Sequence, residues 1–309
     1  MKRKYLAATV AAMITLTTGL VMANPVELDG SASIRYREDG YNGTGTITRF
    51  TLNAKSEIAP NLSLYARFAA ENLNNPNVGR DFAGTKDYTG EFDQYGLLYS
   101  NAGFSYKLGQ QAPIIGGLGL LYDASGYLGN KDYGVADGIN IKGKSGVTSI
   151  DFLAAQQNNS GDNDGKIYST RASYNPVKAV TLGATLAQFK QSNNNTNYYA
   201  ADASYTIGKA TISGEYAKSN ADTNDQAYAI GASYATDAKN SLWVYNYKVE
   251  ANGNIGGMTT FDSNKKGFYY GADHKFTKDT ALHLFYTDRQ TLDTGVKDTS
   301  FRTTVSYNF

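Results

Sequence analysis

The sequence lacks cysteine, and its 309 residues include only one tryptophan, two histidines and five prolines. Without cysteine the chain can form neither disulfide bonds nor thiolate metal sites, so its stability must rest on other contacts. The chain is instead rich in glycine, with 32 residues, and in tyrosine, with 25 residues. Few prolines and many tyrosines favour a fold that is built from many twisted β-strands.

A long uncharged segment occurs only at the N-terminus, where residues 5–23 follow three basic residues at positions 2–4. Val21 and Ala23 provide small side chains three positions and one position before Asn24. We predict that residues 1–23 are a cleaved secretory signal peptide, which exports the chain through the periplasm. An uncleaved membrane anchor is the alternative. Residues 24–309 then form the mature domain.

After residue 24 no segment is long and apolar enough for a spanning helix, and the mean hydropathy of the chain is −0.43. This value would normally indicate a soluble protein, but a transmembrane barrel hides its apolar residues at alternate positions. Loss of the three N-terminal basic residues leaves 26 lysines and arginines against 28 acidic residues, a net charge of about −2. So small a net charge does not predict nucleic acid as a partner.

The last nine residues alternate between an apolar face and a polar face, and the final residue is aromatic. The apolar face carries Phe301, Thr303, Val305, Tyr307 and Phe309, and the polar face carries Arg302, Thr304, Ser306 and Asn308. A strand with these two faces suits a barrel wall between lipid and water. A terminal phenylalanine on the apolar face resembles the ending typical of Gram-negative outer-membrane barrel proteins.

Similar alternation recurs in about sixteen segments of roughly ten residues, the length that a tilted strand needs to cross a bilayer. Short connections, such as 59–61 and 208–209, alternate with longer Asn- and Gly-rich connections, such as 158–165 and 251–266. This alternation is the pattern of outer-membrane barrels, whose strand number is even when both termini lie on one side. We therefore predict an all-β fold, a transmembrane antiparallel β-barrel of about sixteen strands.

The longest connection spans residues 112–132 and follows the fifth predicted strand. Residues 116–122 are rich in glycine and leucine, so exposure of this segment to bulk water is unfavourable. The segment resembles the third loop of general bacterial porins, which folds into the barrel and constricts the pore. It lacks the Pro-Glu-Phe-Gly stretch that is common in enterobacterial porins. An external loop or an oligomer contact is the alternative.

The signal segment, the sixteen strands, the long connection and the terminal phenylalanine together make the chain similar to the general diffusion porins of Gram-negative outer membranes. This resemblance implies a homotrimer that is surrounded by outer-membrane lipid and lipopolysaccharide. It also implies a water-filled channel, without a cofactor, through which small hydrophilic solutes and ions diffuse passively.

The alternation places a group of arginines toward the lumen, since an arginine facing lipid would cost about 2–4 kcal/mol near the membrane midplane. This pore-lining group, on the first three strands and the last strand, consists of Arg35, Arg37, Arg49, Arg67 and Arg302. The first and last strands become neighbours when the barrel closes, so the five arginines are predicted to form one basic wall. Simple solvation of a wet wall is the alternative interpretation.

Carboxylates opposite the basic wall would relieve the repulsion among the arginines and create a transverse electric field. Their predicted source is Asp123, Asp132 and Asp137, on or just after the long connection. Asp93 or Glu91 could serve instead.

The two histidines, His274 and His283, do not support an enzyme. Neither has a serine two positions on, as the motif of barrel phospholipases requires, and Asp273 and His274 fall on opposite faces of their strand. We therefore predict a channel with no catalytic or metal-binding residues. One alternative is a barrel that serves as an adhesin or structural protein. Another is a solute-specific channel with a sugar track formed by Tyr65, Tyr106, Tyr122 and Tyr127.

Overall fold

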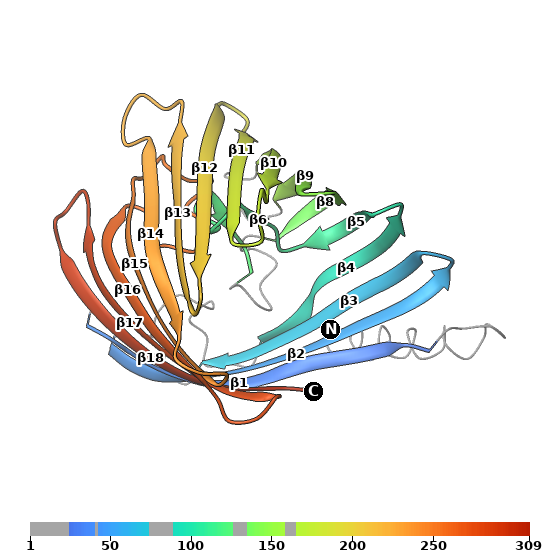
Figure 1. Ribbon diagram of the computed structural model, residues 1–309, viewed down its shortest axis with the longest axis horizontal. Helices are drawn as coiled ribbons and strands as arrows, with labels where there is room; N and C mark the ends of the chain where they lie inside the picture. The colour runs from blue at the N-terminus through green and yellow to red at the C-terminus, as the bar shows by residue number, and fades with distance from the viewer. Residues whose placement is uncertain (1–24, 41–42, 74–88, 126–134, 158–164) are drawn as a thin grey trace.

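The computed structural model describes residues 25–40, 43–73, 89–125, 135–157 and 165–309, and sixteen of the strands in these ranges form a closed barrel (Figure 1). None of these segments is a helix with the length and apolar character needed to cross a membrane. In chain order the barrel strands are β1 (Glu27–Asp39), β2 (Gly43–Ala59), β3 (Leu62–Leu73), β4 (Thr89–Asn101), β5 (Phe104–Gln111), β8 (Ala136–Ser145), β9 (Thr148–Gln157), β10 (Lys166–Tyr174), β11 (Val180–Lys190), β12 (Asn195–Ile207), β13 (Ala210–Ser219), β14 (Gln226–Ala235), β15 (Asn240–Val249), β16 (Lys265–Lys275), β17 (Thr280–Thr291) and β18 (Lys297–Asn308).

The barrel closes through antiparallel pairing of β1 with β18, which places Ile34 opposite Val305. Each of the other strands pairs with its neighbours in the chain order of the barrel, and these pairings are antiparallel as well. Short turns, such as residues 208–209, lie at the end of the barrel that holds Ser31 and Asn308, while the longer connection 250–264 leaves from the opposite end. The predicted all-β barrel of sixteen antiparallel strands is confirmed.

The side chains alternate between an apolar outer face and a more polar inner face. On the outer face Ile34, Leu186 and Ile230 are 55–60% exposed, as expected of side chains that contact lipid. The inner face holds polar side chains that are buried within the barrel, among them Glu71 and Glu215. The alternation therefore gives the wall one surface for lipid and one for the lumen.

The C-terminal residue is fixed to the first strand of the barrel. Phe309 and Gly30 exchange two backbone hydrogen bonds of 3.0 and 3.1 Å, and the Phe309 ring stacks on Phe50 with a centroid distance of 6.1 Å. A Cβ atom at Gly30 would lie 2.6 Å from the Phe309 ring, so glycine is needed where the aromatic ring crosses β1. The terminal phenylalanine therefore completes the outer surface of the closing seam.

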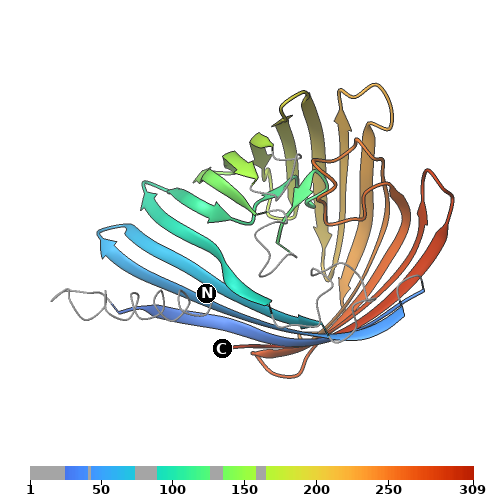
Figure 2. The same cartoon turned by 180° about the vertical axis from the view of Figure 1, so that it is seen from behind.

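A small hairpin, β6 (Ile114–Ile115) and β7 (Tyr122–Asp123), lies within the ring of barrel strands (Figure 2). It belongs to the connection between β5 and β8. The sequence pattern does not predict this hairpin, because each of its strands has only two residues. Its contacts with the wall determine how the described part of the connection, residues 112–125, is held.

Candidate functional site on the inner face of the barrel

The five arginines predicted to line the lumen lie on neighbouring strands of the inner face. Arg35 and Arg37 are on β1, Arg49 is on β2, Arg67 is on β3 and Arg302 is on β18. Arg37 and Arg302 are direct cross-strand partners at the closing seam. The structure thus brings the predicted group together on four contiguous strands.

Two of these arginines form ion pairs with carboxylates of the adjacent strands. Arg49 Nε lies 2.5 Å from Glu71 Oε2, and Arg67 donates two hydrogen bonds of 2.7 Å to Asp93. The Glu71 and Asp93 side chains are 0% and 1% exposed, whereas those of Arg49 and Arg67 are 10% and 17% exposed. The guanidinium groups therefore lie closer to the water of the lumen than the carboxylates do.

Two of the arginines at the seam, Arg35 and Arg302, make further contacts with the wall. Arg35 Nε donates a hydrogen bond of 3.2 Å to Thr304 Oγ1. The guanidinium of Arg302 lies 3.9 Å from the centre of the Phe285 ring, which is the geometry of a cation–π contact. These contacts hold both side chains against the wall.

The sequence analysis considered Asp93 only as an alternative carboxylate and did not identify Glu71. Asp93 is the extra residue at a register shift in the pairing of β3 with β4, between Phe92 and Gln94. Glu71 is the direct cross-strand partner of Arg49, a relation that depends on the register between β2 and β3. The available signal was the shared inner face of Glu71 and Arg67, which are four residues apart on one strand.

Of the three predicted acidic residues, the structure describes Asp123 and Asp137. Asp123 lies on β7, where its carboxylate accepts hydrogen bonds of 2.6 Å from the hydroxyl groups of Thr260 and Ser125. Asp132 falls outside the described residues. Asp137 is on β8, where it is the cross-strand partner of Gln110 on β5. The ion pairs that the structure describes on the basic wall use other carboxylates.

Backbone amides of the inward segment are held by a carboxylate of the opposite wall. Leu118 N and Leu120 N donate hydrogen bonds of 2.6 and 3.4 Å to Glu215 Oε2 on β13. A Cβ atom at Gly116 would lie 2.1 Å from Glu215 Oε1, and one at Gly117 would lie 2.3 Å from Asp202 Cγ. Only glycine therefore permits this close approach of the segment to the wall.

Apolar side chains after this glycine pair bury the segment further. Leu120, Leu121 and Tyr122 are fully buried in a cluster that includes Leu153 and Ile167 of the wall. Burial of each such side chain contributes about 1.5–3 kcal/mol relative to exposure. Residues 112–125 are thus packed on the inner face, and the constriction of the pore by residues 112–132 stays a prediction.

A second connection, residues 250–264 between β15 and β16, is hydrogen-bonded to the inward segment and packs against it. Ile255 N donates a hydrogen bond of 2.9 Å to Leu121 O, and Thr260 N donates one of 3.2 Å to Gly119 O. Ile255 is fully buried in the same apolar cluster. The two connections therefore form one packed unit inside the barrel, which the sequence analysis did not predict.

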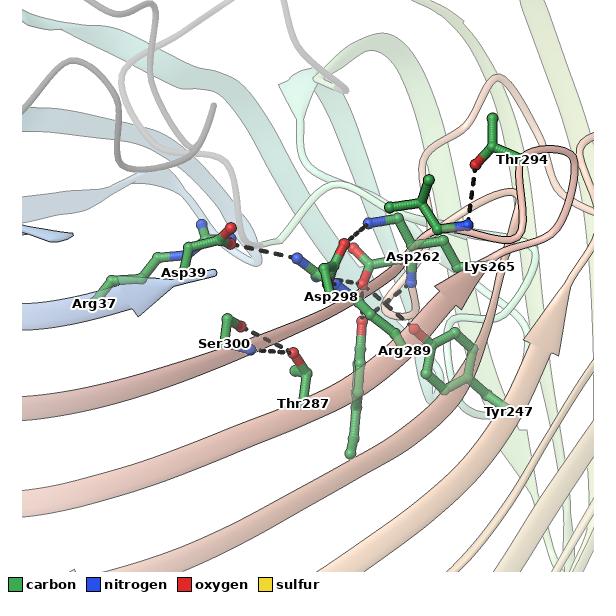
Figure 3. A network of polar contacts seen from close by, with 12 residues as sticks. Arg37, Asp39, Tyr247, Asp262, Lys265, Thr287, Arg289, Thr294, Asp298 and Ser300 are labelled. Carbon is green, nitrogen blue, oxygen red and sulfur yellow. Dashed lines mark hydrogen bonds and ion pairs between the residues drawn. The ribbon is translucent and has the colours of Figure 1, made fainter. Parts of the chain in front are cut away.

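Arg289 of β17 ties this unit to the closing seam (Figure 3). Its guanidinium donates a hydrogen bond of 2.6 Å to Asp262 of the second connection, and it also pairs with Asp298 of β18. A further contact of 3.4 Å reaches Asp39 of β1, which accepts a hydrogen bond of 2.8 Å from Arg37. The Arg289 side chain therefore links β18 and residues 250–264 to Asp39 of β1, and through Asp39 to Arg37 of the basic wall.

The Asp262 carboxylate is held in its ionised form by this network. Burial raises the pKa of Asp262, but Arg289 and Lys265 outweigh this effect and hold the pKa below its usual range. The Tyr269 hydroxyl donates a further hydrogen bond of 2.8 Å to the same carboxylate. Asp262 is therefore negatively charged at neutral pH and can keep the second connection in place.

Replacement of Arg289 by lysine should loosen the network, although the positive charge remains. A lysine ammonium cannot reach three carboxylates in the fixed fork geometry of a guanidinium, so we expect a loss of about 2 kcal/mol in stability. Samples are incubated at a series of temperatures and run on a gel without boiling. The measurement is the incubation temperature at which the band of folded protein disappears. Arg171→Lys is the matched control, since Arg171 pairs with one carboxylate, Asp202, and should cost less. Equal unfolding temperatures for the two variants would contradict the network role of Arg289.

Of the four tyrosines of the predicted sugar track, the three that the structure describes are not brought together. Tyr65 lies on the inner face and its hydroxyl donates a hydrogen bond of 3.1 Å to Gln110 O. Tyr122 is fully buried, and Tyr106 pairs with Tyr99 in the outward-facing alternation of β4 and β5. Tyr127 falls outside the described residues. A sugar track built from these residues is therefore not supported.

Comparisons with known proteins agree with the barrel architecture. A family model described as Gram-negative porin matches residues 7–294. A solved structure of a mutant of the Rhodopseudomonas blastica porin is 12% identical, with a TM-score of 0.61, and the match covers 92% of this chain and 100% of that chain. An anion-selective porin from Comamonas acidovorans is 15% identical, with a TM-score of 0.62, and the match covers 92% and 99%. A search of curated proteins gave no significant match.

Proposed function

Because the chain belongs to the Gram-negative porin family, whose members are diffusion channels of the outer membrane, we propose that solutes cross between its basic wall and its anchored inner segment. The fold and the family support a channel rather than an enzyme. Sixteen strands leave an aqueous lumen, whereas about eight strands would be filled by side chains. Small hydrophilic solutes and ions then move passively down their gradients.

The observation that carries this proposal is the different chemistry of the two sides of the lumen. Arg35, Arg37, Arg49, Arg67 and Arg302 lie on β1, β2, β3 and β18. The inner segment is fixed to the opposite wall at Glu215 of β13. Charged side chains at a pore constriction set which ions and dipolar solutes pass most readily. The arginine side is the expected selectivity element, and the inner segment is the expected constriction.

Reconstitution into planar bilayers under a salt gradient tests this function. We expect stable conductance that grows with salt concentration, and insertion in triplets of equal steps if the channel is a homotrimer, as porins generally are. Liposome swelling should show uptake of small neutral solutes. Folded protein that gives neither conductance nor swelling would refute the channel and would favour an adhesin or structural role.

The outer rim of the barrel supports lipopolysaccharide as a lipid partner. Lys166 and Lys190 are cross-strand partners at the long-loop end of β10 and β11. Like charges directly opposite each other are unfavourable, and a phosphate group between them removes this cost. Lys166→Glu should therefore reduce the amount of lipopolysaccharide that copurifies, whereas unchanged copurification would argue against this contact.

The proposed signal peptide, residues 1–23, is compatible with this location. Cleavage after Ala23 would place Asn24 at the mature N-terminus, three residues before β1 begins at Glu27. The intact mass of the protein from outer membranes should equal that of residues 24–309. A mass that includes residues 1–23 would instead support an uncleaved anchor.

A further inference from the structure

The inner face of β15, β16 and β17 carries an aromatic cluster near the short-turn end of the barrel. Trp243, the only tryptophan of the chain, lies beside His283 and Phe285, with ring centroids 5.6–6.2 Å apart and interplanar angles of 21–45°. Tryptophan in membrane proteins is usually found at the lipid interface. Here Trp243 follows the outward-facing Leu242, which is 54% exposed, so the alternation places the indole in the lumen.

A glycine allows the indole to lie against the wall. Gly271 is the cross-strand partner of both Trp243 and Phe285. A Cβ atom at this position would lie 2.0 Å from carbon atoms of the indole ring. The indole therefore occupies the space above Gly271 that a larger residue would fill, and its ring is supported from below by the backbone of β16.

A polar edge borders the aromatic rings. Asp273 accepts hydrogen bonds of 3.2 Å from Trp243 Nε1 and 3.3 Å from Ser241 Oγ, and its other oxygen lies 2.6 Å from His283 Nδ1. The His283 and Asp273 side chains are 42% and 38% exposed. These two groups are therefore fixed in position and still open to the lumen.

Two rows of cross-strand partners connect this cluster with the basic wall. One row runs through Trp243, Gly271, Phe285, Arg302 and Arg37. The other row runs through Ser241, Asp273, His283, Thr304 and Arg35. Adjacent strands are about 4.8 Å apart, so a carboxylate and guanidinium groups border the aromatic rings on different sides within the span of a small molecule.

We propose that this cluster is a weak binding site for the pyranose ring of a neutral sugar passing through the channel, a proposal that rests on the channel function above. The C–H groups on one face of a pyranose are apolar and carry partial positive charge, which suits contact with the electron-rich face of an indole. The hydroxyl groups at the ring edge can donate to Asp273 and accept from His283 or Arg302.

The charges around the cluster favour a neutral ligand. Asp273 repels a ligand carboxylate, while Arg302 and Arg35 repel an organic cation. A hydroxylated ring carries no net charge, and each hydroxyl group can act as donor or acceptor. The described residues therefore match a sugar better than they match either type of ion.

The single tryptophan gives a direct measurement of this binding. Titration of the detergent-solubilised protein with glucose should change the Trp243 emission and saturate in the millimolar range. Mannitol has similar hydroxyl groups but no ring, and it should cause no saturable change. Absence of a saturable change with glucose would overturn the proposal, and so would an equal change with mannitol. A saturable response to tetramethylammonium or benzoate, but not to glucose, would also overturn it.

Conductance recordings separate this site from the channel function itself. In the wild-type channel glucose should produce saturable excess current noise, while Trp243→Ala and Gly271→Ala should weaken this effect about tenfold, equivalent to the loss of one aromatic contact. Trp243→Phe should retain part of it. Tyr270→Ala, which removes a lipid-facing aromatic ring of β16 next to Gly271, is the matched control and should behave as the wild type. Normal salt conductance with no glucose effect would leave the channel function standing and refute the sugar site.

Discussion

Replacement of Arg49 and Arg67 by glutamine is expected to shift the channel strongly toward cations. In wild-type protein each guanidinium balances a carboxylate that is almost completely buried, Glu71 or Asp93. The double substitution removes two positive charges and leaves two negative charges on the same part of the wall. A local potential that changes by one to two kT per unit charge acts on cations and anions in opposite directions, so it alters the cation-to-anion permeability ratio about 7- to 55-fold.

The measurement is the reversal potential in a planar bilayer under a salt gradient. High salt should reduce the difference between variant and wild type, since the Debye length falls from about 10 Å at 0.1 M to about 3 Å at 1 M. A reversal potential equal to that of the wild type at low salt would contradict a selectivity role for the arginine side.

A matched variant distinguishes charge from altered shape. Arg49→Gln combined with Glu71→Gln removes both members of one pair, so the net charge of the wall does not change. We expect nearly wild-type selectivity from this variant, although its geometry is at least as disturbed as that of Arg49→Gln alone. The variant with both Arg49→Gln and Glu71→Gln also avoids an uncompensated buried charge, which costs about 3–5 kcal/mol when one partner of a buried pair is removed. It should therefore fold at least as well as the single variant.

The arginines of this wall could be predicted from the sequence because their positions depend on one simple rule. Alternation along each strand places Arg35 and Arg37 opposite to Ile34 in direction, and the energy cost of arginine in lipid decides which face is inside. The terminal phenylalanine identified the closing strand, which places Arg302 on a strand adjacent to that of Arg35 and Arg37. Neither step requires knowledge of the register between strands.

The carboxylates were harder to predict because their contacts depend on register and on the path of long connections. The pairing of Arg49 with Glu71 follows from the β2–β3 register. Glu215 carried no local signal at all, because its partners Leu118 and Leu120 are about one hundred positions away in the chain.

The glycine pair of the inner segment is visible in the sequence, but the sequence does not explain why glycine is needed there. Gly116 and Gly117 were recognised as part of a glycine-rich stretch, but the reason for them lies on β12 and β13. A side chain at either position would collide with Asp202 or Glu215. Close approach of the backbone to a wall carboxylate can be identified only once the two segments are placed together.

Release of the inner segment from Glu215 is expected to have the second large effect. Glu215→Ala leaves the amides of Leu118 and Leu120 without their acceptor inside the barrel, which costs about 1–3 kcal/mol. The population of channels with a displaced segment should therefore rise about 5- to 150-fold, which a bilayer recording reports as frequent transitions between conductance levels. Glu215→Gln keeps an oxygen acceptor at the same place, so its conductance should be nearly as steady as that of the wild type. A quiet Glu215→Ala channel would show that the apolar cluster around Leu121 holds the segment without help from the carboxylate.

Gly116→Val approaches the same contact from the segment side and should disturb the current more strongly. Its Cβ would lie 2.1 Å from Glu215 Oε1, and its φ of +101° is a conformation that valine rarely adopts. Gly146→Val separates these two causes, since Gly146 also has a positive φ, of +59°, but a Cβ there meets no atom within 4 Å. If backbone strain alone mattered, the two variants would show similar noise. If the contact with Glu215 holds the constriction, only the Gly116 variant should fluctuate, and its combination with Glu215→Ala should add little further noise because both changes break one interaction.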